Sequence, residues 1–304
     1  MEIALALVAA LLFALGTVLQ QKAGLDGPTD TDAPGGTSGL LLQMARRPVW
    51  LAGIAADALG FAAQAVALTI GRLAVVQPLL VSSVVFALPL GVKLTGQTVR
   101  RIDIVAALVV AAALAAFLLV ADPSGGRDDA PFGEWMIACG ACIGAAALLM
   151  LVARGAPAAR RAAVVGAAAG ILFGLTAALT KSVGDQFADS VLSIFTHWHL
   201  YGLIAVGYVA LTLSQLSLQT GVLAPAIAAC MAADPIASVV LGTTIMQESL
   251  DTSAVSIAVA VLALLAASGG LVVLARTQGE GAATKPAGGT QGMRAKAPAP
   301  QPAA

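Results

Sequence analysis

Long apolar runs alternate with short polar interruptions along almost the whole chain. Nine of these runs have about the 20 residues that a helix needs to cross the hydrocarbon core of a bilayer. The first run carries Glu2 and no basic residue at its start, so we interpret it as a membrane span rather than a signal peptide. The pattern predicts spans over residues 2–21, 49–70, 73–93, 103–121, 132–153, 162–182, 197–217, 222–245 and 252–275.

The composition agrees with this pattern. Of the 304 residues, 59% are hydrophobic and 11% are charged, whereas soluble domains have about 25% charged residues. The chain therefore has too little charge to cover a soluble surface of its size, and we expect an all-α membrane protein. Its Ala-rich composition is typical of a high-GC bacterial source, which suggests the cell membrane as its location. The net charge of +0 gives no indication of a nucleic-acid partner.

The basic residues favour one side of the predicted membrane. When the loops are assigned alternately to the two sides, thirteen of the 16 basic residues fall on one side, and only Arg72, Arg127 and Lys181 fall on the other. The side rich in Lys and Arg is expected to be cytoplasmic. This places the N-terminus outside and the C-terminus in the cytoplasm, which requires an odd number of spans.

The two halves of the chain resemble each other. An offset of 160 aligns residues 12–15 with 172–175, and an offset of 151 aligns Gln64 with Gln215. The corresponding spans are five positions apart in the order of spans, an odd number, so the second copy would enter the membrane from the opposite side, an architecture common in secondary transporters. We predict an inverted repeat of five plus four helices, with halves at residues 1–155 and 156–276 and a disordered cytoplasmic tail at 277–304.

Polar side chains inside the spans are the candidate functional groups. Asp57 and Asp234 are the two carboxylates that lie away from the ends of the predicted spans, and an ionisable group at that depth is a functional hypothesis by default. Asp57 and Gln64 are seven residues apart on one helix, as are Tyr208 and Gln215 on the matching helix, so each pair shares a helix face. The alternative is a neutral, packed aspartic acid.

Two spans that match in the repeat contain two prolines each. A proline removes one backbone donor and leaves the carbonyl four residues earlier without its partner. Paired interrupted helices of this kind are typical of transport sites, although kinks that serve packing alone are the alternative. Gln77 and Asp234 each precede one of these prolines, and Ser83 lies one turn further on. The prolines expected to interrupt the helices are Pro78, Pro89, Pro225 and Pro235.

The oxygen-rich groups leave the substrate open. Carboxylate, amide and hydroxyl oxygens suit Mg²⁺, and they suit a proton or the amine of a small metabolite equally well. Glycines repeat every four residues at 166, 170 and 174 and again at 140 and 144, which predicts close helix packing, with a homodimer face as the alternative. Lys181 is expected to extend toward the membrane interface.

The chain lacks the sequence motifs of several classes of enzyme and of ATP-driven pumps. The chain contains no nucleotide-binding glycine loop, no nucleophile elbow and no H-E-x-x-H sequence. We therefore expect neither an enzyme nor a primary pump, and no cofactor.

The chain resembles a known superfamily. The inverted repeat, the short loops and Glu248 after the eighth span resemble the drug/metabolite transporter (EamA-like) superfamily, although the first-half counterpart of Glu248 is Gln97. Within it, residues 50–53 (WLAG), 61–65 (FAAQA) and 76–79 (VQPL) are similar to stretches of the NIPA-like magnesium transporters. The resemblance implies transport of a small molecule or a divalent cation.

The sequence as a whole predicts a transporter that works by alternating access around a cavity near the membrane midplane. Its partners would be the lipid bilayer and a small-molecule or ion substrate. A non-transporting membrane scaffold or accessory subunit is the alternative. The residues expected to line the cavity are Asp57, Gln64, Gln77, Ser83, Tyr208, Gln215 and Asp234.

Overall fold

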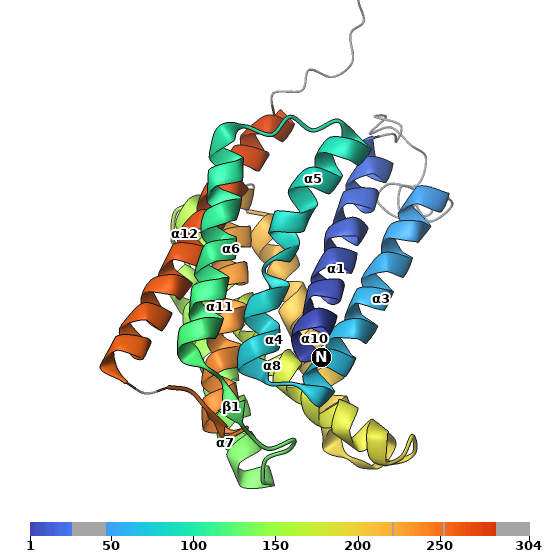
Figure 1. Ribbon diagram of the computed structural model, residues 1–304, viewed down its shortest axis with the longest axis vertical. Coiled ribbons are helices and arrows are strands. Elements are labelled where there is room, and N and C mark those ends of the chain that lie inside the picture. The colour runs from blue at the N-terminus through green and yellow to red at the C-terminus, as the bar shows by residue number, and fades with distance from the viewer. Residues whose placement is uncertain (26–46, 221, 252, 284–304) are drawn as a thin grey trace, which may run out of the picture.

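The computed structural model describes residues 1–25, 47–220, 222–251 and 253–283, and most of this part is helical (Figure 1). Two two-residue strands, β1 (Ser124–Gly125) and β2 (Glu248–Ser249), pair in antiparallel fashion. The helices are α1 (Glu2–Leu25), α3 (Pro48–Ile70), α4 (Leu73–Leu80), α5 (Ser83–Thr95), α6 (Arg101–Ala121), α7 (Phe132–Ala153), α8 (Ala158–Asp189), α9 (Ser193–Thr196), α10 (Trp198–Leu218), α11 (Leu223–Thr244) and α12 (Ala254–Ala283).

The predicted all-α membrane class is confirmed. The described residues contain nine helices that are long and apolar enough to cross a membrane, with α4 and α5 together forming one of them. Large apolar side chains face outward along the bundle: Leu119 is 81% exposed, Ile137 74% and Leu262 64%. Soluble proteins rarely leave so much apolar surface uncovered, so this surface fits a lipid environment. The chain is a multi-pass integral membrane protein.

Two helices are longer than the sequence pattern predicts. The helix α8 begins at Ala158 and continues to Asp189, well past the predicted end at residue 182. The helix α12 continues to Ala283, so the predicted tail begins with helical residues, and residues 284–304 lie outside the described part. Polar side chains at residues 182, 185 and 186 hid the continuation of α8, since an apolar pattern ends where a helix leaves the hydrocarbon core.

Local sequence signals set several helix ends. Pro48 is the first residue of α3, where a missing backbone donor has no effect on the helix. Gly96 ends α5 with φ of 66°, a left-handed conformation that glycine adopts without strain. At the start of α6, the backbone N–H of Arg100 donates to Asp103 Oδ2 at 2.8 Å, which satisfies a group that the helix leaves unpaired.

The centre of the bundle is the contact between α8 and α11. The glycines of α8 lie so close to α11 that an added Cβ at Gly166 would be 2.3 Å from the carbonyl oxygen of Ala226, and one at Gly170 would be 2.4 Å from that of Cys230. The expected packing role of this glycine series is therefore present. Gly140 and Gly144 on α7 have no atom within 4 Å of such a Cβ and pack against nothing described.

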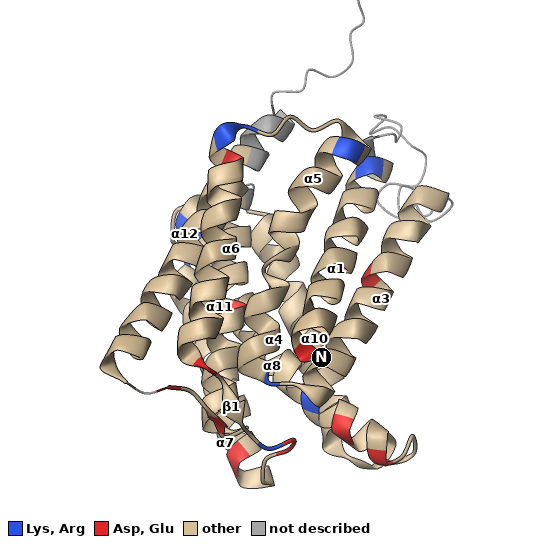
Figure 2. Cartoon of the chain, in the orientation of Figure 1, with Lys and Arg blue, Asp and Glu red and all other residues tan. Residues whose placement is uncertain are grey.

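Acidic residues lie mainly at one end of the bundle and basic residues mainly at the other (Figure 2). We call one end acidic. The helices that begin at the acidic end are α1, α4, α7, α10 and α12, and the helices that end there are α3, α6, α8 and α11. Its acidic residues include Glu2, Asp129 and Glu248. The basic end, opposite, contains residues such as Lys22, Lys93 and Arg101. The loops that the sequence assigned to one side of the membrane therefore gather at one end of the molecule.

Candidate functional site

A cavity of about 280 Å³ lies among the membrane-spanning helices. Both halves of the chain line it, with side chains from α1, α3, α4, α5, α8 and α11. Its volume is at the small end of the range of ligand pockets, about 300–1,000 Å³. The lining residues are Phe13, Phe61, Gln64, Gln77, Leu80, Val81, Ser83, Phe173, Thr176, Ala177, Thr180, Met231 and Asp234.

Four of the residues predicted to line a cavity meet here. Gln64 comes from α3, Gln77 from α4, Ser83 from the start of α5 and Asp234 from the middle of α11. Gln77 is only 2% exposed, and its Nε2 has no hydrogen-bond partner among the described residues. A buried donor without a partner is unfavourable by about 1–3 kcal/mol, so it is a candidate contact for a ligand.

The remaining three predicted residues lie elsewhere. Asp57 faces α1, where Gln20 Nε2 donates to its Oδ2 and Gly16 packs against its carboxyl group. Tyr208 is 72% exposed on α10, and Gln215 is exposed on the same face. A spacing of seven residues puts two side chains on one helix face but does not determine which way that face points. Here the α10 face that packs inward carries Ala210 and Ser217 instead.

The four prolines differ in their effect on the helices. The span that contains Pro78 is interrupted at residues 81 and 82, between α4 and α5, where Val81 N and Ser82 N donate to carbonyls three residues earlier. The helix α5 continues through Pro89, and α11 continues through Pro235. Pro225 lies in the first turn of α11, where its missing donor has no helical partner to lose. A single missing hydrogen bond can thus be absorbed without a break when the neighbouring turns remain bonded.

Sequence reasoning missed most of the apolar wall of the cavity. Phe13 and Phe61 pack edge to face, with ring centroids 4.9 Å apart, and Phe173 joins them from α8. Thr176 and Thr180 also line the cavity, while each of their hydroxyls donates to a carbonyl of α8. Apolar residues in a membrane helix look alike in sequence whether they face lipid or a cavity. The pairing of residues 13 and 173 in the repeat alignment is the one signal that pointed to two of these rings.

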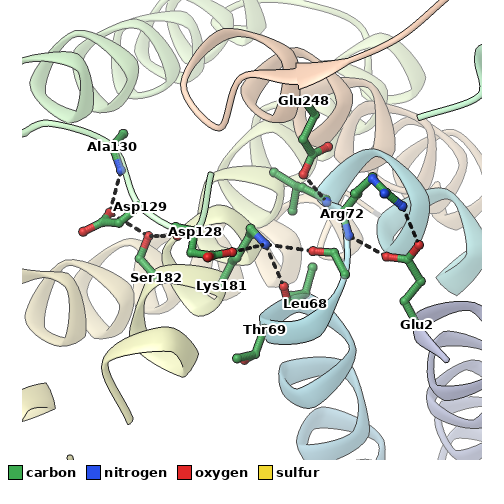
Figure 3. Close-up of polar contacts among 12 residues, drawn as sticks. Glu2, Leu68, Thr69, Arg72, Asp128, Asp129, Ala130, Lys181, Ser182 and Glu248 are labelled. Atoms are coloured by element: carbon green, nitrogen blue, oxygen red, sulfur yellow. Dashed lines mark hydrogen bonds and ion pairs between the residues drawn. The ribbon is translucent and has the colours of Figure 1, made fainter. Parts of the chain in front are cut away.

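At the acidic end, Glu248 connects the segment after α11 to the start of α4. Its carboxylate accepts hydrogen bonds from the first two backbone N–H groups of α4, Leu73 N at 2.6 Å and Ala74 N at 2.8 Å (Figure 3). An acid at a helix N-terminus satisfies unpaired donors and interacts well with the helix dipole. Burial raises the pKa of Glu248, although the two backbone donors oppose the shift. Gly242 leaves the room for this side chain, since a Cβ there would lie 2.5 Å from Glu248 Oε2.

Lys181 makes a second connection at the same end (Figure 3). The side chain is not extended to the interface as expected but is 5% exposed. Its Nζ donates to the carbonyls of Leu68 at 3.2 Å and Gly71 at 2.8 Å, at the end of α3, and lies 3.5 Å from Asp128 Oδ1. A cation at the C-terminal end of a helix is favourable because the unpaired carbonyls carry partial negative charge. A buried Lys is thus stabilised by groups that the sequence pattern could not place next to it.

Asp129 is a third polar centre. Trp135 Nε1 and Ala130 N donate to its Oδ1 at 2.8 Å, Ser182 Oγ donates at 2.9 Å, and His199 Nε2 lies 3.3 Å away. Burial opposes ionisation of this carboxyl group, but the nearby His199 and the three hydrogen bonds outweigh it and hold the pKa of Asp129 well below its ordinary value. His199 is itself buried, and its Nδ1 forms a hydrogen bond of 2.8 Å with Gln186 Nε2.

An apolar layer lies between the cavity and the acidic end. Leu68, Leu73, Val76 and Met246 belong to one buried cluster, and each lies closer to the acidic end than the cavity residues of the helix that it belongs to or directly follows, α3, α4 or α11. These side chains lie between the cavity and the polar contacts of Glu248 and Lys181.

The chain is similar in sequence to an uncharacterized bacterial protein. The chain is 29% identical over 287 residues to an uncharacterized protein of Corynebacterium glutamicum, and the match covers 93% of this chain and 96% of the relative. No known protein family matches the chain, and no solved structure matches it.

Proposed function

We propose that this protein is a transporter that moves a small metabolite, or a divalent cation such as Mg²⁺, across the membrane by alternating access. The observation that carries the proposal is the cavity within the spans, which contains Asp234 and the unpartnered amide of Gln77. A protein that served only as a scaffold would have no reason to keep polar groups at that depth, where each is unfavourable unless it is satisfied.

The contacts at the acidic end support alternating access. The bonds of Glu248 to α4 and of Lys181 to α3 join the second half of the chain to the first. Arg127 donates its backbone N–H to the carbonyl of Met246 at 2.7 Å and adds another such connection. These are hydrogen bonds that can break and reform, as a gate at one end of a transport pathway requires. We infer that the acidic end opens in the alternate state.

The proposed orientation follows the charge distribution. With the basic end in the cytoplasm, the acidic end faces outward and attracts cations toward the pathway.

The packing is consistent with the proposed inverted repeat, since α1 packs on α3 as its counterpart α8 packs on α10, and the counterparts α6 and α12 pack against each other. The proposed location is the cell membrane of a bacterium. A homodimer through the open Gly140 face of α7 is compatible with this arrangement.

Accessibility of single cysteines tests the proposal. Ser83→Cys and Thr180→Cys would be made in a background in which Cys139, Cys142 and Cys230 are replaced by alanine, and labelled with a charged, membrane-impermeant thiol reagent. In oriented vesicles we expect labelling from the basic side in the state described here. We also expect labelling from the acidic side in a minor population.

The scaffold alternative predicts the opposite result. A packed interior excludes the reagent, so neither cysteine would be labelled from either side while the protein remains folded. A matched control is Leu262→Cys on the exposed surface of α12, which faces lipid in both accounts and should resist the charged reagent.

A further inference from the structure

We propose that the cavity binds a small organic ammonium ion, with Asp234 as its counter-ion, Gln77 as a donor to a second polar group of the ligand, and the rings of Phe13, Phe61 and Phe173 around its apolar part. This inference rests on the proposed transport function and specifies its substrate class. The ligand chemistry follows from four features of the cavity.

The first feature is an acid without a basic partner. In the described part of the chain, Asp234 accepts one weak hydrogen bond, from Ser238 Oγ at 3.4 Å, and no Lys, Arg or His nitrogen lies within 4 Å of it. An ionised carboxylate inside a membrane protein requires a compensating charge. A cationic ligand supplies that charge and can donate hydrogen bonds to the carboxylate oxygens.

The second feature is the amide of Gln77. Its side chain is almost fully buried at the cavity wall, and its Nε2 donates to no described group. A donor in this position requires an acceptor, such as a hydroxyl, a carbonyl or an ether oxygen of the ligand. The ligand would therefore carry an oxygen in addition to its cationic nitrogen.

The third feature is the aromatic wall. Phe13 is held against Gly60, where an added Cβ would lie 2.9 Å from its ring, and its ring meets Phe61 at an interplanar angle of 78°. Aromatic faces attract organic cations, with the strongest effect where water is excluded. Three phenylalanines and Met231 also offer apolar contact to the carbon atoms of a ligand.

The fourth feature separates this ligand from a divalent metal ion. Mg²⁺ prefers six oxygen ligands in near-octahedral geometry. Asp234 is the one carboxylate among the lining residues, and the described residues contain no group of three or more His, Cys, Asp or Glu side chains that could hold a metal. The remaining wall is mostly apolar, which suits an organic cation better than a hydrated ion.

Binding to the purified protein in detergent tests the inference without requiring transport. The probes are choline, its uncharged isostere 3,3-dimethyl-1-butanol, phenethylammonium and MgCl₂, followed by isothermal titration and by the shift of the unfolding temperature. Choline should bind, phenethylammonium should bind more weakly because it has no oxygen to accept from Gln77, and the neutral alcohol and MgCl₂ should not bind. Asp234→Asn should weaken ammonium binding by about ten-fold or more, as expected from loss of a charge-charge contact. Asp234→Glu should retain part of the affinity.

The control is Asp189→Asn, which removes the same charge from the exposed end of α8, far along that helix from the cavity residues. It should leave the affinity unchanged. Equal binding of choline and the alcohol, unchanged affinity in a folded Asp234→Asn protein, or no binding of either ammonium probe to folded wild type would overturn the inference. Tighter binding of MgCl₂ would overturn it in favour of a divalent cation. Ammonium binding without flux in vesicles would instead sustain the site and contradict transport, so the two failures are distinguishable.

Discussion

Polar residues inside the spans of this protein differ in the neighbours that satisfy them. Asp234 and Gln77 stand out in apolar helices, and the structure places both at one cavity. Asp57 stands out equally in the sequence, but in the structure it packs on α1 and accepts a hydrogen bond from Gln20. The sequence predicts that a polar group lies inside a span, but it does not show which neighbour satisfies that group. The aromatic wall and the burial of Lys181 depend on tertiary contacts between the two halves, which no local pattern contains.

At the residue scale, Asp129 makes a pH-dependent contribution to stability. Its pKa is lower in the folded protein than in the unfolded chain, so it stabilises the fold above the ordinary aspartate pKa of about 4, and this contribution is lost as the pH falls through the lower folded value. Asp129→Asn should therefore lower the unfolding temperature in detergent near neutral pH. The difference from wild type should shrink in more acidic buffer, as wild-type Asp129 becomes protonated.

Asp189→Asn serves as the control, because it changes the same charge at an exposed position of the same end. It should leave the unfolding temperature close to that of wild type across the range. A difference between wild type and Asp129→Asn that stays constant from neutral to acidic pH would show that the hydrogen bonds of Asp129 do not depend on its charge.

At the scale of elements, the hydrophobicity of the sequence predicts that the helices exist, but it does not predict where they end or where they are interrupted. All nine spans were predictable because each run is long enough to cross a bilayer. The interruption after Pro78 and the continuity through Pro235 came from similar local sequences. The surroundings of the two prolines differ: Gly170 and Gly174 pack closely against α11 on both sides of Pro235, whereas α4 is a separate short helix whose N-terminus is bound by Glu248.

The contact between α8 and α11 is testable with a single methyl group. In Gly170→Ala the new Cβ would lie 2.4 Å from the carbonyl oxygen of Cys230 and 2.8 Å from Ala233 Cβ, so the helices must separate. Overpacking of this kind costs about 1–3 kcal/mol, and we expect a lower unfolding temperature in detergent. Gly140→Ala on α7 is the matched control, because its Cβ would meet no atom within 4 Å, and it should be neutral or slightly stabilising. Equal effects of the two substitutions would be inconsistent with close packing at Gly170.

At the scale of the whole molecule, the two halves meet in a cavity and are joined by hydrogen bonds at the acidic end. The charge asymmetry that the sequence shows between alternate loops appears as two chemically different ends (Figure 2). What the sequence could not provide is which end joins the two halves by hydrogen bonds. That depends on Glu248 reaching α4, 175 residues away along the chain, and on the pairing of β1 with β2.

A reversible cross-link at the acidic end tests the central claim most directly. Ser124 and Ser249 are paired residues of β1 and β2, and directly opposed Cα atoms in such a pair are about 4.5–5.5 Å apart, within the range that a disulfide spans. Ser124→Cys with Ser249→Cys, in the background without native cysteines, would be reconstituted in vesicles and assayed for uptake of radiolabelled choline. We expect uptake when the pair is reduced, little uptake when it is oxidised, and recovery with a reductant, whereas each single cysteine variant should be unaffected. Uptake that is equal in the oxidised and reduced protein, with the disulfide fully formed, would contradict it, as would the absence of any uptake by the reduced, folded protein.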